Sequence, residues 1–514
     1  MTARGEPEII THEREQLAYL LTEAAEIEHG LMCCYLYAAG SLKAGSAGLG
    51  DDEARAIARW RATIVEVAVD EMLHLSLVSN LLAAIGSTPH FQRPNFPVAP
   101  GYHPAGVVVA LAPFDRATLD HFIFLERPEG VDLPDGAGFE SPTRYERVAR
   151  SDRLVPSAQD YATVGHLYRG IREGFVQLAA KLGEDALFLG DPAAQVGPDI
   201  APLDGLLAVT GVAGAVRAVD TIVHQGEGAP EHRDTSHFSR FVSIRDELDA
   251  LSRRRADFSP AHPAARNPVM RKPPKPRGKV HVDDPSSARV LDLGNAVYAF
   301  ALRCLARAFG EASDPPRARG RLVESSITAM RELGPLMQRL AEMPASPSAP
   351  GTTAGLTFTM QRSTVGFSQQ HAAWAILAER AREIALAGQS IARDVDPIAA
   401  RAAEAFTAIA ATLAKEAPPS PGSCKAISPP LAPPTPAAAT AAPSTPDPIP
   451  ASPAIEEATA PNAILRFEGK RCIHSRNCVL GAPDVFLANV KGPWLHPEAV
   501  PVDELAAIAH SCPS

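Results

Sequence analysis

Residues 11–86 carry a hydrophobic pattern with the period of an α-helix. In the second half of this stretch, apolar side chains recur at spacings of three and four, which places them on one buried stripe. They are Ile57, Trp60, Ile64, Val67, Val78, Leu81 and Ile85. An earlier buried line consists of Leu17, Ala24, Leu31 and Ala38. Gly86 and then Pro89 end the pattern, so two long helices are predicted.

The middle of the chain alternates between irregular and helical stretches. Residues 87–160 are rich in Pro, Gly and aromatic side chains, and they predict a long irregular crossover. Helical periodicity then predicts helices at 161–183, 204–225 and 236–256. A bundle of four helices with one long crossover is typical of the ferritin-like topology. Further helical periodicity at 288–312, 318–343 and 368–415 predicts a second helical layer, packed on the first bundle or standing as its own domain.

Two Pro-rich stretches divide the chain into parts. Residues 258–286, which include NPVMRKPPKPRGK, predict a basic and extended connector between a bundle at 1–257 and a second helical region at 287–415. Residues 416–461 consist mostly of Pro, Ala, Ser and Thr, and this composition cannot bury a core, so a linker is predicted. Residues 462–514 regain hydrophobic and aromatic side chains and form a final module.

Composition narrows the classes of partner. The chain has 514 residues, of which 46% are hydrophobic and 21% charged, as in ordinary soluble proteins. A net charge of −10 argues against nucleic acid or an anionic membrane as a partner. The N-terminal stretch MTARGEPEIITHERE has no apolar core of a signal peptide, and no apolar run approaches the roughly 20 residues of a membrane span. We therefore expect a cytoplasmic protein that does not contact a membrane.

Two polar side chains interrupt the apolar stripe of the second helix. Glu71 and His74 lie in line with Val67 and Val78, and a buried charge is costly unless it is paired or bound to metal. A Glu-x-x-His pair that projects inwards is the ligand unit of carboxylate-bridged di-iron bundles. Glu28 lies on the buried line of the first helix and can point at Glu71. The pattern predicts a metal site, and a buried network of ion pairs or hydrogen bonds is the alternative.

The final module concentrates cysteines. Three of the seven cysteines fall in the last 43 positions, and in a reducing compartment this clustering suggests metal ligation more than disulfides. Cys472 and Cys478 occupy the first and third positions of a loop in which ligands recur every third residue. The second position falls on Ser475, with His474 beside it, and Cys512 supplies a distant thiolate. The alternatives are a zinc knuckle with His474 as the fourth ligand, or three unrelated thiols.

The module resembles the divergent mono-cluster ferredoxin domain and other single-cluster bacterial ferredoxins. The residues that carry the resemblance are the motif CIHSRNC, the run APDVF, the pair PW and the segment CPS. The resemblance implies an iron–sulfur cluster held by Cys472, Cys478 and Cys512. Because no cysteine occupies the second ligand position, the cluster is either 3Fe–4S, or 4Fe–4S completed by Ser475, His474 or solvent.

The helical part resembles the ferritin-like iminophenyl-pyruvate dimer synthases, which include the violacein and rebeccamycin enzymes that join two aromatic imino-acid units. The matching segments are EIEHGLMCCYLYAAGSLKAG, DEMLHLSLVSNLLAAIG, FQRPNFP, YATVGHLYRGI and IVHQGEG. The resemblance implies metal ligation by Glu28, Glu71, His74, His166, His224 and His237. The family usually has Glu at the positions of His166 and His224, so a set of about four Glu and two His would become about two Glu and four His. This change shifts the metal preference away from hard di-ferric chemistry.

The expected fold class is mainly α. It comprises a ferritin-like helical bundle with a second helical layer, a Pro-rich linker and a small α+β ferredoxin-like iron–sulfur domain. The first functional hypothesis is an oxidoreductase that acts on a small aromatic or amino-acid-derived substrate, as in the oxidative coupling of imines in secondary metabolism. Iron or another transition metal would lie in the bundle, and the iron–sulfur cluster would supply or accept electrons. The second is a non-catalytic metal-binding or redox-sensing scaffold that passes electrons to a separate redox partner protein.

Overall fold

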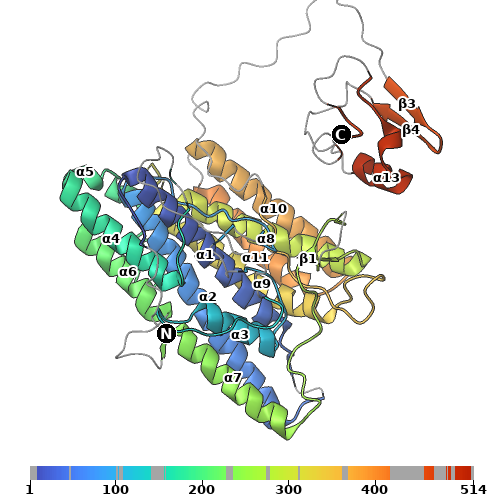
Figure 1. Cartoon of the computed structure of the whole chain (residues 1–514), viewed down its shortest axis with the longest axis horizontal. Helices are drawn as coiled ribbons and strands as arrows, with labels where there is room; N and C mark the ends of the chain where they lie inside the picture. The colour runs from blue at the N-terminus through green and yellow to red at the C-terminus, as the bar shows by residue number, and fades with distance from the viewer. Residues whose placement is uncertain are drawn as a thin grey trace, which may run out of the picture. The chain divides into compact units, whose positions relative to one another are not determined.

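A computed structural model of the chain contains two compact units (Figure 1). One unit holds helices α1 to α11, and the other holds elements β3 to α13. The structure describes residues 8–45, 48–99, 102–103, 108–139, 156, 158–226, 235–273, 278–310, 313–361, 369–416, 456–467, 482, 484–487 and 493–510. Each unit is considered separately below.

The first unit begins with the predicted helical bundle. Its helices are α1 (Arg14–Ser41), α2 (Asp51–Ala84), α4 (Val164–Leu182), α6 (Val212–Gly226) and α7 (His237–Arg254). Helix α1 packs along α2 and α4, α4 packs along α6, and α2 also contacts α6 and α7 (Figure 1). The short helix α5 (Glu184–Leu187) and the 3-10 turn η1 (Pro192–Ala194) connect α4 to α6. The ferritin-like arrangement that the periodicity predicted is thus present.

The apolar stripes of α1 and α2 form the centre of this bundle. Every residue that the sequence placed on either stripe is buried. At the N-terminus of α2, the backbone amide of Gly50 donates a hydrogen bond of 2.8 Å to the Glu53 carboxylate. It ends before Gly86, whose φ of +82° lies in the left-handed region that favours glycine. Helix α2 is also long and apolar enough to cross a membrane, but most of it is buried inside the body, as expected of a core helix.

The crossover that was predicted to be irregular contains a helix, α3 (Arg116–Leu125). The Asp115 carboxylate accepts a hydrogen bond of 2.7 Å from the amide of Thr118 and so caps its N-terminus. Its apolar face buries Leu119 and Phe122, and the helix packs on α7. The prediction of an unbroken irregular segment at 87–160 was therefore wrong. The helix matters for the site described below because it positions Glu126, the residue that follows it.

The second helical layer consists of α8 (Pro285–Ala308), α9 (Pro316–Glu342), α10 (Gln370–Asp394) and α11 (Ala399–Glu416). These helices pack as the pairs α8–α9, α10–α11, α8–α10 and α9–α11, and α9 also packs on α1. The layer belongs to the same compact unit as the first bundle. The helical pattern at 368–415 is divided because Pro397 cannot continue a helix, and the Asp396 carboxylate accepts from the amide of Ile398 at 3.0 Å.

Two short parallel strands, β1 (Pro268–Val269) and β2 (Val280–His281), lie in the stretch predicted as a connector. The second unit contains an antiparallel hairpin of β3 (Glu456–Ala460) and β4 (Ala463–Phe467), followed by η3 (Pro497–Ala499) and α13 (Val502–His510). Its small core includes Leu465, Val485 and Phe486. Strand β3 lies within the stretch predicted as a linker to residue 461, so the ordered unit starts several residues earlier. The expected fold class, mainly α with a small α+β unit, is confirmed.

Candidate metal centre

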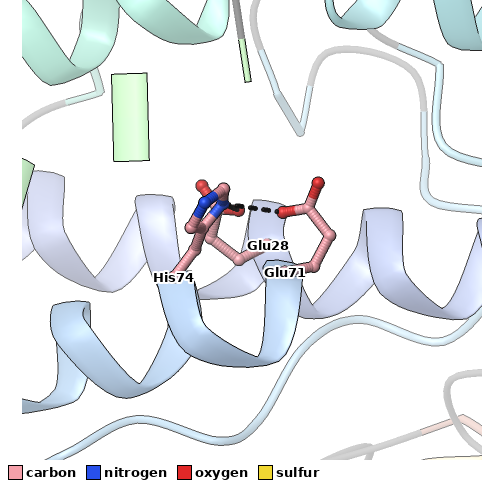
Figure 2. Close-up of side chains that lie close together, drawn as sticks. All are labelled: Glu28, Glu71 and His74. Atoms are coloured by element: carbon pink, nitrogen blue, oxygen red, sulfur yellow. Dashed lines mark hydrogen bonds and ion pairs between the residues drawn. The ribbon is translucent and has the colours of Figure 1, made fainter. Parts of the chain in front are cut away.

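Three buried side chains meet between α1 and α2 (Figure 2). The Nδ1 atom of His74 lies 3.2 Å from a carboxylate oxygen of Glu28 and 3.1 Å from one of Glu71. Glu71 and His74 are one helical turn apart on α2, so both point towards α1, where Glu28 lies on the facing stripe. The structure thus brings together the three residues that the sequence predicted to lie on facing stripes. All three side chains are 2% exposed, so their charges must be compensated inside the protein.

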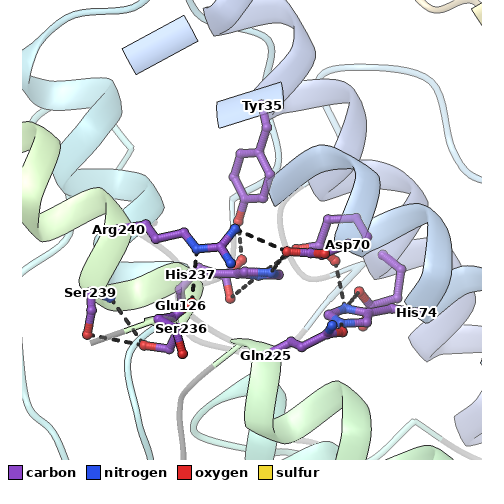
Figure 3. Close-up of polar contacts among 12 residues, drawn as sticks. Tyr35, Asp70, His74, Glu126, Gln225, Ser236, His237, Ser239 and Arg240 are labelled. Carbon is purple, nitrogen blue, oxygen red and sulfur yellow. Dashed lines mark hydrogen bonds and ion pairs between the residues drawn. The ribbon is translucent and has the colours of Figure 1, made fainter. Parts of the chain in front are cut away.

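A second group of ligand atoms shares Glu71 with the first group. Its other members, His237 and Glu126, are labelled in Figure 3. The Nδ1 atom of His237, the first residue of α7, lies 3.1 Å from the other carboxylate oxygen of Glu71. It also lies 3.6 Å from a carboxylate oxygen of Glu126, which follows α3. Glu71 therefore offers one oxygen to each group, as a carboxylate that bridges two metal ions does. The rings of His74 and His237 are stacked with centroids 5.5 Å apart.

Outer hydrogen bonds fix the orientation of both imidazoles. The Nε2–H group of His74 donates to the side-chain oxygen of Gln225 at 2.9 Å. The Nε2–H group of His237 donates to Asp70 at 3.3 Å, and Arg240 holds that carboxylate at 3.2 Å. Histidines that ligate metals usually donate the other ring N–H in this way, which leaves a lone pair on the inward nitrogen. With metal bound, both Nδ1 atoms would offer these lone pairs to the ions.

Two tyrosines satisfy the carboxylate oxygens that point away from the imidazoles. The Tyr35 hydroxyl donates to Glu126, and the Tyr168 hydroxyl donates to Glu28. Tyr35 and Tyr168 are almost completely buried. Carboxylates that accept such hydrogen bonds keep one oxygen fixed while the other faces the centre. Tyr35 of α1 and Tyr168 of α4 thus support the ligand set from two sides.

The local chemistry of the centre fits metal binding. The inward Nδ1 atom of His237 is buried and makes no hydrogen bond of acceptable geometry among the described residues, although carboxylate oxygens lie within 3.6 Å. A small cavity of about 20 Å³ adjoins Glu28, Glu71, His74 and Glu126. Three carboxylates and two imidazoles of this kind suit iron, manganese or zinc.

Burial and mutual repulsion set the proton positions in the metal-free protein. Burial, followed by the nearby Glu71 carboxylate, raises the pKa of Glu28 to about 8. Burial also opposes ionisation of Glu71, but the hydrogen bond from Glu28 and the charge of His74 lower its pKa overall. For His74, burial disfavours the charged ring, but the carboxylates of Glu71 and Glu28 outweigh it and raise the pKa to about 10. Protons thus occupy the places that a metal ion would take.

The structure gathers four of the six residues that the sequence and the family resemblance suggested as ligands in the body: Glu28, Glu71, His74 and His237. It does not gather His166 and His224. His166 is buried at the start of α4, and its Nδ1 accepts a hydrogen bond of 3.2 Å from the amide of Ala162. His224 is exposed near the end of α6. The described set therefore has three Glu and two His, rather than the predicted two Glu and four His.

Two contributors were missed by sequence reasoning. Glu126 lies directly after the apolar run of α3, and it was overlooked because that helix was taken for loop. The sequence does contain signals for both. Asp115 is a good N-cap and indicates the start of a helix, and an acidic residue directly after an apolar helical run is unusual. Gln225 lies next to His224, so the expected helix was right but the side chain that reaches the site is one position later. Residues Cys472, His474, Ser475, Cys478 and Cys512 lie outside the described residues.

Comparison with known families agrees with both units. The ferritin-like profile matches residues 21–246, and the profile of the divergent 4Fe–4S mono-cluster family matches residues 459–514. The first match spans all residues of the metal centre described above, and the second includes all three C-terminal cysteines. The chain therefore contains a ferritin-like domain at residues 21–246 and a divergent 4Fe–4S mono-cluster domain at residues 459–514.

Two curated relatives make the relationship more specific. The chain is 28% identical to dichlorochromopyrrolate synthase of Lentzea aerocolonigenes, over 75% of this chain and 40% of that enzyme. It is 27% identical to 2-imino-3-(indol-3-yl)propanoate dimerase of Chromobacterium violaceum, over 66% of this chain and 33% of that enzyme. The resemblance to the rebeccamycin- and violacein-type family is thereby confirmed. The chain spans well under half the length of each relative.

One solved structure is also similar. A ferritin-like protein from Caulobacter vibrioides aligns with a TM-score of 0.39 and 20% identity, over 68% of this chain and all of that one.

Proposed function

We propose that the protein is a metal-dependent oxidoreductase with two redox centres. The ferritin-like centre acts on a small aromatic or amino-acid-derived substrate, and the iron–sulfur domain exchanges electrons with it. By their names, one curated relative synthesises dichlorochromopyrrolate and the other dimerises 2-imino-3-(indol-3-yl)propanoate. Oxidative coupling of an imine in secondary metabolism is the reaction class that this relationship favours.

The observation that carries the proposal is the sharing of Glu71. One carboxylate faces two groups of ligand atoms, the first completed by Glu28 and His74 and the second by Glu126 and His237. A pair of metal ions held in this way, when bound, supplies one-electron and two-electron redox chemistry. The chain itself would hold the ions, fix both imidazoles through Gln225 and Asp70, and exclude bulk water through burial.

The iron–sulfur domain supports a redox function rather than metal storage. Its family profile matches the C-terminal residues, and Cys472, Cys478 and Cys512 are the thiolates that would ligate the cluster. Ser475, His474 or solvent would complete a 4Fe–4S cluster, whereas three thiolates alone would hold a 3Fe–4S cluster. An iron–sulfur domain on the same chain could supply electrons to a metal centre that changes oxidation state, or accept electrons from it.

One observation favours a non-catalytic alternative. The cavity at the ligand set is about 20 Å³, which accommodates a water molecule but not an aromatic substrate. If side chains around the centre do not move, only a species of the size of dioxygen or water could reach the ions. The protein would then be a metal-binding or redox-sensing scaffold whose iron–sulfur domain passes electrons to an external partner.

The decisive experiment is metal and acid-labile sulfide analysis, with EPR spectroscopy, on full-length protein purified without oxygen. We expect sulfide and cluster iron in addition to about two further metal ions per chain. A Cys478→Ser variant should lose sulfide and the cluster signal but retain the two additional ions. Zinc in place of cluster iron, with no sulfide, would refute the iron–sulfur part of the proposal, and absence of the additional ions would refute the metal centre.

Catalysis is then tested separately from metal content. Metal-loaded protein with its cluster reduced or oxidised would be incubated with 2-imino-3-(indol-3-yl)propanoate, generated in situ, with and without dioxygen. Formation of a coupled product that is lost in Glu71→Gln supports the oxidoreductase. No consumption of this and related imines by fully metal-loaded protein favours the scaffold.

A further inference from the structure

A large apolar cavity lies between the two helical layers of the first unit. It has a volume of about 560 Å³, within the range of small-molecule sites, and α1, α2, α8 and α9 supply most of its lining. Along α2 its lining runs from Arg61 to Ser76, a rise of about 22 Å, and along α9 from Val323 to Gln338. The cavity is therefore elongated. Protein interiors are otherwise close-packed, so an empty space of this size calls for an occupant.

The cavity opens beside the middle of α2. Val65 and Val69, which line it, are 38% and 44% exposed, although both are apolar. Gly334 of α9 also lines it, and a Cβ atom built at that position would meet no atom within 4 Å. The space is thus both accessible and unfilled.

The two ends of the cavity differ in polarity. Arg61 marks one end, because it donates to the carbonyls of Leu42 and Lys43 at 2.7 Å, just beyond the C-terminus of α1. Gln338 lies at the same end, since Gly40 of α1 closely approaches the residue before it on α9. Arg331, an exposed residue two helical turns before Gln338, also lines the cavity.

The opposite end is apolar. Asn80, one turn after Ser76 on α2, donates to the carbonyl of Leu207 at 2.9 Å, so this end of α2 lies beside the segment after η1. Leu203 from that segment lines the cavity together with Val323 and Phe309. Among the described residues that line the cavity, there is no Asp or Glu, in a chain whose net charge is −10. The lining is complementary to a molecule with an apolar body and an anionic head.

The cavity is separate from the metal centre. Met72 and Leu75 of α2 face the cavity, whereas Glu71 and His74 in the same turns face the metal ligands. The small cavity at the centre and the large one have no lining residue in common. A ligand in the large cavity would therefore contact the other side of the α1–α2 pair and not the metal ligands.

We propose that this cavity binds a long-chain aliphatic carboxylate, with its chain along α2 and α9 and its carboxylate at Arg331. The elongated apolar lining suits an extended alkyl chain better than a compact ring system. Arginine side chains bind carboxylates through two parallel N–H groups. Among the described residues, Arg331 makes no ion pair with a carboxylate, so its N–H groups remain available to the ligand.

The test is isothermal titration calorimetry of the full-length, metal-loaded protein with decanoate and, separately, with decan-1-ol. Arg331→Gln should weaken decanoate binding by about 10-fold or more and leave decan-1-ol binding within about 2-fold, because only the carboxylate loses a charged partner. Arg55→Gln, on α2 but outside the cavity, is the matched control and should change neither.

A second pair of variants tests the location. Gly334→Leu should obstruct the cavity one turn from Arg331 and weaken binding of both compounds, whereas Gly334→Ala, which has the same backbone restriction before Pro335, should retain it. Thermal melting by circular dichroism and metal analysis of every variant separate loss of binding from loss of the fold or of the metal centre.

Three results would overturn the inference. Unchanged binding in Gly334→Leu would place the ligand elsewhere. Equal loss of decanoate and decan-1-ol in Arg331→Gln would exclude recognition of the carboxylate. If decanoate did not bind, and the protein formed a dimer that Val69→Asp dissociated, a second copy of the chain would cover the opening instead.

Discussion

Replacement of Glu71 by glutamine tests the metal centre most directly. Among the described residues, Glu71 is the one that belongs to both groups of ligand atoms. Glutamine has nearly the same shape but no charge, and its amide nitrogen cannot ligate a metal. The imidazoles of His74 and His237, each 3.1 Å from a different oxygen of Glu71, would lose their shared anionic partner. The substitution therefore affects both metal positions at once, without removing volume from the core.

The expected loss of metal affinity is large. Removal of residues that only support a ligand typically costs 10- to 100-fold in affinity, and loss of a ligand shared by two ions should cost at least about 100-fold for each. We expect metal content to fall from about two ions per chain to one or fewer. Removing one partner from a buried ion pair destabilises a protein by about 3–5 kcal/mol. We expect the lower end for metal-free Glu71→Gln, because Glu28 still lies 3.2 Å from His74 and the imidazoles can release their protons.

Glu66→Gln is the matched control, since Glu66 lies on α2, is exposed and takes no part in the centre. Metal content would be measured by elemental analysis after reconstitution with ferrous iron, in a Cys478→Ser background that removes the cluster iron. Stability of the metal-free chains would be followed by urea unfolding with circular dichroism at 222 nm. If Glu71→Gln retained two ions with the affinity of Glu66→Gln, Glu71 would not bridge them, and the assignment of a shared centre would be wrong.

Three further predictions concern protons, orientation and electron flow. The pKa values of Glu28 and His74 are raised in the folded metal-free protein, so its stability should fall as pH rises from about 5 to 10. Ferrous-ion affinity should increase over the same range, because the ion displaces those protons. Urea midpoints and metal titrations at pH 6, 7.5 and 9 should therefore show opposite slopes, and metal-free stability that increased with pH would contradict the assignment. Gln225→Leu should lower metal affinity by about 10- to 100-fold without changing the set of ligands, because His74 loses the acceptor for its outer N–H group. A Gln225→Asn variant with unchanged affinity would show that Nε2 of His74 needs no acceptor at that distance. Residues 416–461, predicted to be a linker, should raise the effective concentration of the iron–sulfur domain at its own body to around the millimolar range. The rate at which the cluster reduces the metal centre, measured by stopped flow, should then be independent of protein concentration in the intact chain. If dilution slowed this electron transfer, the electrons would pass between separate molecules or to an external partner.

The sequence determined the parts of the centre that depend on one helix. Glu71 and His74 are three residues apart, so helical geometry alone puts them on one face, and the apolar residues before and after show that this face is buried. The same reasoning placed Glu28 on the facing stripe of α1, because two long apolar stripes in consecutive helices must pack on each other. The C-terminal cysteine motif was equally local, and its family profile confirms the domain although the ligands lie outside the described residues.

Only the tertiary structure decided which distant residues complete the centre. Glu126 and His237 lie at helix ends, where the direction of a side chain depends on how α3 and α7 dock and not on a periodic pattern. His224 was a reasonable candidate from the sequence, but a rotation of about 100° per residue on α6 turns it outwards and brings its neighbour Gln225 to His74. The large cavity between the layers was likewise invisible in the sequence, because the residues that line it look like ordinary core positions until four helices are placed around the space. Periodicity fixes the buried face of each helix, whereas the contents of the space between the helices follow from their packing.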